Sequence, residues 1–406
     1  MISIDEQRAV LDYYYRSFAP DIALASDADL TGTRVSSNQP LALLDLSGQP
    51  LFYDFDILGA DGKRVGVARS SARGTEFPLL DSIMIGKQLF EPDEARKRAI
   101  AQAAKDFPGS TIGETSFVCY GYPRVGVLVP VQAQGKQLSA LYDAPSGYAV
   151  KTWEGPYTPP ESGLPSGEET EGQPFYSYLD RVPESAAPGI TAITARWSSA
   201  IAFFEQSPSF QTLAFAGVGE AKPATPKPVI RGTLLPVPLF GQQTPVYCAI
   251  ATAKMMLEYL GYTGHSQDEI AQAMGTGADG TTNAGMVAGF KKLTNNEWNE
   301  QIDMSPTFDK AETFLAQSLP AKSAIPGHAR ALRGWREYVY LDPKTGKTSH
   351  TERFYIINDP YPVNAGQLVM ENFQKPMSDY YRNLLCPVRN SAPSLLIPGG
   401  VPPVLT

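Results

Sequence analysis

The first 153 residues carry two rounds of a helix-like hydrophobic pattern followed by strand-like patterns. Ser3 and Glu6 have the spacing of a capping box, which predicts a helix to about Phe18. A proline at its start, an acidic first turn and a Pro-Gly end predict a second helix over residues 92–107. Apolar runs between turn residues predict strands at 41–46, 50–58, 63–70, 115–122, 124–131, 136–143 and 147–153. We therefore expect residues 1–153 to form an α+β domain of helices and antiparallel strands.

Proline and glycine interrupt the middle of the chain. Residues 154–189 are rich in Pro, Gly, Ser and Glu, and prolines recur again between residues 218 and 238. We interpret residues 154–234 as a linker with one short helix near 194–205. Proteolytic maturation would fall in the extended segment 218–240, directly before the last region. A linker that is never cut is equally consistent with the sequence.

A helix with one buried face opens the last region. After Cys248, apolar residues at 249, 250, 253, 256, 257 and 260 keep a period of 3.6, and Gly261 ends the helix. Helices at 266–274, 285–293 and 311–318 and then strands at 328–333, 335–341 and 351–357 follow from the same kind of pattern. We expect residues 235–390 to be a second α+β domain, and residues 391–406, rich in Pro and Gly, to be a flexible tail.

Composition narrows the possible functions. The net charge of −8 and the lack of a basic run argue against nucleic-acid binding. No apolar stretch approaches the roughly 20 residues of a membrane span. Three cysteines are too few for a disulfide framework, so Cys119 and Cys386 are expected to be buried thiols. No residues have zinc-ligand spacing, and we expect no metal and no cofactor. The first residues lack signal-peptide character, which predicts a cytoplasmic protein, unless a removed leader directed it to the cell envelope or outside.

Cys248 lies where a helix favours a thiolate. In the first helical turn, unpaired backbone N–H groups and the helix dipole stabilise a negative charge on sulfur. Gln242, six residues upstream, could bring its side-chain amide beside the sulfur. Together with the N–H of Cys248, that amide would supply two donors to the oxyanion of an attacked carbonyl.

A glutamine followed six residues later by a cysteine that opens a helix resembles the papain-like cysteine peptidases, and more closely their bacterial C39-like branch. Residues 265–271 (HSQDEIA) and 277–282 (GADGTT) are similar to that branch's second helix and the loop beyond it. The resemblance covers about residues 235–390. It implies a papain-like fold, in which the cysteine helix packs on an antiparallel sheet.

The resemblance also singles out a base among the three histidines. His328 follows a Pro-Gly pair and begins a predicted strand as Gly-His-Ala, which is similar to the histidine strand of the family. His265 precedes a helix and His350 lies beside a turn, so both are expected at the surface. Arg330 and Arg333 are charged positions on a strand that is often apolar in the family. They suggest an exposed edge or a partner surface.

The imidazole then needs a side-chain oxygen on a neighbouring strand to orient it. In the C39-like branch an Asp of an Asp-Pro pair has this role, which favours Asp359. Papain-type enzymes use an Asn, which keeps Asn358 as the reserve. Adjacent strand residues face opposite sides of a sheet, so only one of the two can serve.

These residues together predict a cysteine peptidase that hydrolyses protein or peptide substrates through Cys248, His328 and Asp359, with Gln242 in the oxyanion hole. The N-terminal domain, similar in layout alone to small prodomains, is expected to act as an intramolecular inhibitor. Two alternatives stay open from sequence. One is a protein-glutamine deamidase or transamidase with the same triad, and the other is a papain-like binding module without activity.

Overall fold

The computed structural model describes residues 4–150, 170–171 and 228–390, apart from gaps at 27, 47, 73–79, 87–89, 134, 279, 326, 343–344 and 374–382. The helix predicted near 194–205 and the tail at 391–406 lie outside the described residues. None of the helices in the described part has both the length and the apolar run that a bilayer crossing requires.

The first helix is longer than the sequence predicts. α1 spans Ile4–Ser26 and continues through Pro20, although a proline removes one backbone hydrogen bond and disfavours the interior of a helix. Ile22 and Ala25, which both follow the proline, are buried against the sheet. The guanidinium of Arg333 donates to the carbonyl of Ala25 (2.8 Å), which satisfies one of the last backbone acceptors of the helix. Tertiary packing therefore outweighs the local preference to stop near Phe18.

The rest of the N-terminal part is strands with one further helix. The predicted helix over 92–107 is confirmed as α2, Pro92–Asp106, and its buried Ala95, Ala99 and Ala103 allow close packing on the strands. The strands are β1 (Arg34–Val35), β2 (Leu41–Leu44), β3 (Pro50–Leu58), β4 (Arg64–Ser71), β5 (Ser82–Gly86), β6 (Thr111–Ile112), β7 (Ser116–Gly121), β8 (Arg124–Ala133) and β9 (Lys136–Asp143). The sequence did not predict β1, β5 or β6. Of the strand predicted at 147–153, the described residues contain only an isolated bridge at Ala149, and residues 151–153 lie outside them.

The C-terminal part places helices first and most strands afterwards, as expected. Its helices are α5 (Cys248–Tyr259), α6 (Gln267–Met274), α7 (Asn283–Leu293) and α8 (Phe308–Ala316). The predicted capping box at the start of α6 is present, with Ser266 and Glu269 bonding each other's backbone N–H groups. The strands are β10 (Thr170–Glu171), β11 (Val229–Leu234), β12 (Thr281–Thr282), β13 (Trp298–Asp303), β14 (Ala321–Ile325), β15 (His328–Leu341), β16 (Thr348–Asp359), β17 (Gln367–Asn372) and β18 (Asn383–Arg389).

Two strands predicted separately, 328–333 and 335–341, are one continuous strand, β15. The predicted break falls at Gly334, where the register with β16 shifts between Leu332 and Gly334. A Cβ at this glycine would come within 2.6 Å of the Thr233 carbonyl oxygen on β11. Gly334 is therefore a close-approach position inside a bulged strand rather than a turn.

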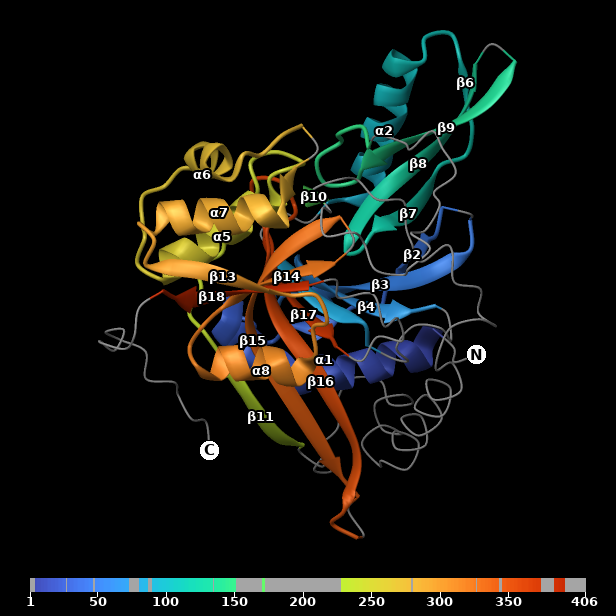
Figure 1. Ribbon diagram of the computed structural model, residues 1–406. Helices are drawn as coiled ribbons and strands as arrows, with labels where there is room; N and C mark the ends of the chain where they lie inside the picture. The colour runs from blue at the N-terminus through green and yellow to red at the C-terminus, as the bar shows by residue number, and fades with distance from the viewer. Residues whose placement is uncertain are drawn as a thin grey trace.

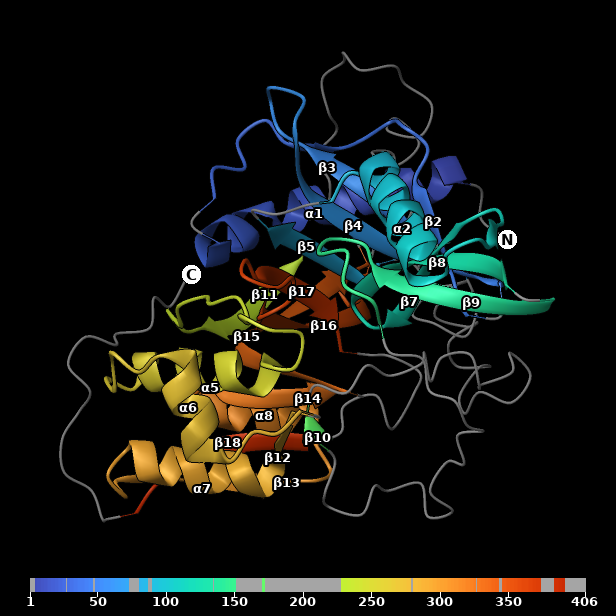
Figure 2. The same cartoon turned by 90° about the horizontal axis from the view of Figure 1, so that it is seen from above.

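A single sheet runs through both parts of the molecule. Its strand order is β13-β18-β14-β15-β16-β17-β5-β4-β3-β2-β7-β8-β6, with β1, β11 and β9 attached beside it. The joint is the antiparallel pair of β17 and β5, from Gln367 opposite Gly86 to Glu371 opposite Ser82. Figure 2 shows these two strands side by side in the middle of the molecule, between the N-terminal strands and the helices α5–α7.

Both faces of the joint are buried. Ile83 and Ile85 of β5 and Leu368 and Met370 of β17 pack in the same cluster as the apolar face of α1. Met84 and Val369, which alternate with them, lie in a second cluster that includes residues of α2 and α8. The two parts thus share one sheet and common cores (Figure 1). The domain ranges 1–153 and 235–390 stay predictions, since the sheet crosses from one to the other.

Candidate active site

Cys248 is the first residue of α5 and is fully buried. Its neighbour at the N-cap, Tyr247, does not cap the helix with its side chain, whereas Ser266 does so for α6. Cys248 packs in one apolar cluster with Ala329, the residue that follows His328. The structure therefore places the predicted nucleophile at the positive end of a helix dipole, next to the start of β15.

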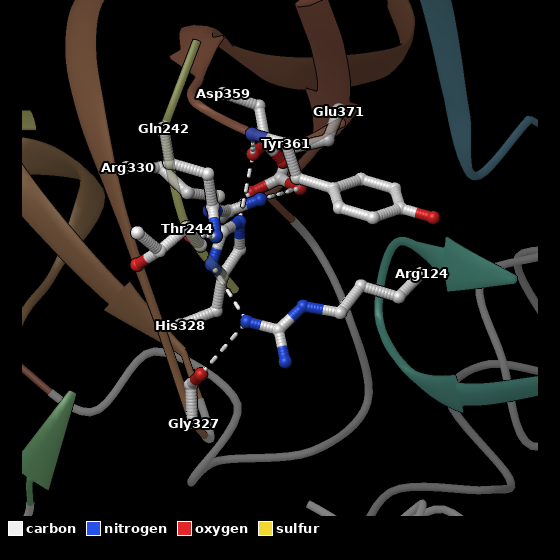
Figure 3. Close-up of polar contacts among 9 residues, drawn as sticks. All are labelled: Arg124, Gln242, Thr244, Gly327, His328, Arg330, Asp359, Tyr361 and Glu371. Carbon is white, nitrogen blue, oxygen red and sulfur yellow. Dashed lines mark hydrogen bonds and ion pairs between the residues drawn. The ribbon is translucent and has the colours of Figure 1, made fainter. Parts of the chain in front are cut away.

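Asp359 and His328 meet at the ends of two paired strands. His328 begins β15 and Asp359 ends β16, and antiparallel pairing brings these ends together. The Nε2 atom of His328 lies 2.7 Å from Oδ1 of Asp359, and both side chains are fully buried (Figure 3). The same Oδ1 atom accepts the backbone N–H of Tyr361 at 2.9 Å, which fixes the carboxylate.

Asn358 faces away from the imidazole. Its amide nitrogen donates to the carbonyls of Val237 (2.9 Å) and Pro238 (3.1 Å), and its oxygen accepts from Arg333 (3.3 Å). Asn358 therefore holds the chain that leads into the loop before Cys248. Of the two adjacent candidates, the structure brings Asp359 to His328 and uses Asn358 for this anchoring.

Gln242 is held in place by its backbone. Its N–H donates to the carbonyl of Pro360 (2.9 Å) and its carbonyl accepts from Asn364 (2.7 Å). Its side-chain Nε2 donates to the carbonyl of Thr244 at 2.8 Å, within its own loop, and the side chain is buried. In this structure the predicted oxyanion donor is thus paired inside the loop, and its backbone is bonded to Pro360, the residue that follows Asp359.

A second glutamine, Gln267, fixes the same loop from the other side. Its Nε2 atom donates to the carbonyl of Gly241 (2.7 Å) and its Oε1 atom accepts the N–H of Gln243 (3.0 Å). A Cβ at Gly241 would come within 2.4 Å of the backbone nitrogen of Ala365, so the loop approaches the 360–366 turn too closely for another residue. Gln267 lies in the stretch 265–271 that resembles the family's second helix, but nothing in the sequence indicates this role.

The other nitrogen of His328 contacts a residue from the N-terminal part. Nη2 of Arg124, the first residue of β8, lies 2.9 Å from Nδ1 of His328 and donates to the carbonyl of Gly327 at 2.9 Å (Figure 3). A guanidinium has only donors, so Nδ1 accepts and the ring proton sits on Nε2, where it points to Asp359.

Burial keeps the imidazole neutral. Loss of solvation lowers the pKa of His328 from 6.5 to about 4, and the charges of Arg124 and Arg330 lower it too, although Asp359 acts in the opposite direction. At neutral pH the ring is therefore an uncharged donor to Asp359 and an acceptor for Arg124. Nothing in the sequence marks Arg124, because its contact with His328 spans 204 residues.

The expectation for Arg330 and Arg333 was wrong. Neither lies on an exposed edge, because both side chains are buried. Arg330 forms a two-bond ion pair with Glu371 of β17 (2.7 and 2.8 Å), and Arg333 donates to the carbonyls of Leu235 and Ala25 (both 2.8 Å). The sheet is covered on both faces here, so charged residues are retained only with matched partners.

The remaining chemistry of the described residues is sparse. All three cysteines are free and buried, as predicted for Cys119 and Cys386. Burial raises the pKa of the Cys119 thiol to about 12 and also raises that of Cys386. Within the described ranges, no group of three or more His, Cys, Asp or Glu side chains is arranged to hold a metal ion.

Comparison with known proteins agrees with the resemblance seen in the sequence. Residues 234–385 match the profile of the Peptidase_C39 like family. Among solved structures, the chain is similar to the peptidase domain of Streptococcus ComA, a bifunctional ABC transporter involved in a quorum-sensing pathway, at 16% identity over 36% of this chain and 95% of that one. The TM-score of 0.25 is too low to carry a structural argument. No curated protein matches. The family match confirms a C39-like, papain-like region in the C-terminal part.

Proposed function

We propose that the C39-like region makes this protein a cysteine peptidase, with Cys248 as nucleophile, His328 as base and Asp359 as the group that orients it. One observation carries the proposal: the 2.7 Å contact between His328 and Asp359, buried at the head of a strand that packs beside Cys248. A His–Asp pair excluded from water next to a helix-start cysteine suits a thiolate mechanism.

The proposed reaction needs one free nitrogen on His328. Because Nε2 is held by Asp359, Nδ1 takes the proton of the Cys248 thiol, and the carboxylate stabilises the imidazolium that forms. The thiolate attacks the substrate carbonyl, and His328 then protonates the departing amine, which leaves a thioester on Cys248. Water, deprotonated by His328, cleaves the thioester and restores the thiol.

One contact would change during this reaction. The Nε2 atom of Gln242 has two N–H donors, so it can keep its bond to the Thr244 carbonyl and donate the other to the oxyanion beside the N–H of Cys248. For His328 to accept the thiol proton, its Nδ1 atom must lose Arg124. The structure is therefore consistent with a resting, latent form, in which Arg124 of the N-terminal part contacts the base.

Alkylation of the full-length chain tests the proposal. Iodoacetamide is added at neutral pH to Arg124→Ala, in which Nδ1 of His328 is free, and to the same variant combined with His328→Ala, Asp359→Asn or the neighbouring control Asn358→Ala; the modification of each cysteine is followed by peptide mass spectrometry. Loss of the base or its orienting carboxylate is expected to slow labelling of Cys248 by roughly tenfold to a hundredfold, because less thiolate forms. Asn358→Ala should retain most of the rate.

Equal rates at Cys248 in Arg124→Ala with and without His328→Ala or Asp359→Asn would contradict the proposal. Cys119 and Cys386 serve as internal references, since both thiols are buried and uninvolved. Cleavage of a peptide mixture that disappears in Cys248→Ala would then separate hydrolysis from a transfer reaction, because the two give products of different mass.

A further inference from the structure

Arg124 reaches the base from outside the C39-like region. It begins β8, directly after the turn that links β7 and β8 at the N-terminal end of the shared sheet, and only 6% of its surface is exposed. Figure 3 shows its side chain extending from that strand to His328, opposite the side held by Asp359. We propose that Arg124 is a built-in cap that blocks the one nitrogen of His328 able to take the thiol proton. This inference rests on the proposed function.

Arg124 in its capping position excludes an ion pair between a Cys248 thiolate and a His328 imidazolium. A guanidinium keeps its charge at any physiological pH and has no acceptor atoms. If Nδ1 took a proton while Arg124 stayed in place, two N–H donors and two positive charges would face each other across 2.9 Å. The imidazolium that pairs with a thiolate can therefore form only after Arg124 has moved.

A second arginine supports the turn that presents the cap. Arg69 of β4 donates to the carbonyl of Pro123, the residue before Arg124, at 3.2 Å. Arg69 is itself fixed by a buried two-bond ion pair with Asp54 of β3 (2.7 and 2.8 Å). Its guanidinium also lies over the ring of Tyr122 in the same turn, 5.6 Å from the ring centre. The position of Arg124 is thus built into the N-terminal strands.

A further contact between the two parts lies beside the cap. Asp143, at the end of β9, accepts hydrogen bonds from Tyr361 and from Tyr120 (both 2.8 Å). Tyr361 is two residues from Asp359, and its N–H is bonded to that carboxylate. The β7–β9 strands therefore meet the active-site end of β16 at two points, Arg124 and Asp143.

The cap is not released by separating the two parts of the chain. β5 stays paired with β17, and α1 packs across that joint, whether or not the segment between residues 151 and 227 is cut. We therefore expect a local shift of the Arg124 side chain and its turn to uncap His328. Departure of the whole N-terminal part is not required.

Nuclear magnetic resonance of the histidine rings tests the cap directly. The full-length chain has three histidines, so ¹⁵N-labelled rings give few signals, and the tautomer and pKa of each ring can be followed. In wild type, His328 should be neutral with Nδ1 as acceptor and a low pKa. In Arg124→Ala the pKa of His328 should rise, because a positive charge and a donor to the unprotonated nitrogen are lost. Cys248 alkylation at neutral pH should rise by roughly tenfold or more.

Two further variants make the test specific. Arg98→Ala removes an arginine that also donates to carbonyls of the N-terminal part, those of Ala144 and Pro145, and should change neither readout. Arg124→Gln keeps a donor without the charge, should shift the pKa of His328 less than the alanine variant does, and provides a folded variant if Arg124→Ala unfolds.

The outcomes separate the two proposals. An unchanged tautomer and pKa of His328 in both Arg124 variants, with an unchanged alkylation rate, would overturn the cap. A shifted His328 pKa without faster alkylation of Cys248 would keep the cap and overturn the proposed peptidase mechanism.

Discussion

Arg330 of β15 and Arg124 of β8 are both buried, and both lie near the start of β15, but their hydrogen-bond partners differ. Arg330 faces Glu371, a carboxylate that matches both ends of the guanidinium, and both side chains are inaccessible to solvent. Arg124 faces a neutral imidazole and a backbone carbonyl. Each guanidinium makes two of these hydrogen bonds, but bonds to a carboxylate are stronger than bonds to neutral acceptors. The comparison is between an arginine that is matched by an opposite charge and one whose movement the proposed cap requires.

The largest effect is expected from breaking the matched pair. Arg330→Met leaves the carboxylate of Glu371 buried without its cation, and should lower the free energy of unfolding by about 3–5 kcal/mol. Urea denaturation followed by tryptophan fluorescence measures this. The double variant Arg330→Met/Glu371→Leu removes both charges and should recover most of the loss. If the single variant loses less than about 1 kcal/mol, this ion pair does not secure the joint between β15, β16 and β17.

Glu352, a buried carboxylate that is bonded to a tyrosine, extends the comparison to a charge with a neutral partner. Burial raises the pKa of Glu352 on β16 from 4.5 to about 7, although its hydrogen bond from Tyr14 of α1 lowers it. The folded state then binds the proton more tightly than the unfolded state. The stability this proton provides is complete below pH 4.5, and it is lost as the pH rises from there to above 7. Glu352→Gln should remove this loss, raising stability at pH 8 by about 3 kcal/mol relative to wild type.

Thermal or urea unfolding at pH 4.5, 6 and 8 checks the pH dependence. The difference between Glu352→Gln and wild type should grow with pH. If the difference in stability between the variant and wild type stays constant across these pH values, the pKa of Glu352 is the same in the folded and unfolded states.

The smallest stability effect is expected at Arg124. Arg124→Ala leaves the Gly327 carbonyl and one imidazole nitrogen without their donor, but no carboxylate is stranded, so the loss should be about 2 kcal/mol. The same unfolding measurement as for Arg330→Met makes the two values directly comparable. A loss as large as that of Arg330→Met would make Arg124 a structural residue and remove the contrast.

Local sequence signals predicted much of the C-terminal part. The helix that begins at Cys248 followed from its apolar period, and α6 followed from its capping box. Both signals lie within one element, where neighbouring residues decide the structure. The preference for Asp359 over Asn358 came from the family resemblance. The structure places these adjacent side chains apart, with Asp359 on the imidazole.

Long-range contacts were the part that sequence could not supply. β5 was missed because five mostly apolar residues buried on both faces show no alternation. Without β5 the N-terminal part looked independent, whereas its strands continue the sheet of the C39-like region. Arg124 was missed for the same reason, since its partner depends on that continuation. Arg330 and Arg333 were misjudged because their carboxylate and carbonyl partners are remote in sequence.

The β5–β17 joint bears on what kind of signal could activate the protein. In a zymogen that sheds its prosegment, activation is irreversible, since the severed piece diffuses away. Here a nick between residues 151 and 227 would yield two chains still joined through a common sheet. Under the proposed cap, Arg124 would therefore remain beside His328 after such a nick, and inhibition would be reversible. The activity would then follow the stimulus in both directions.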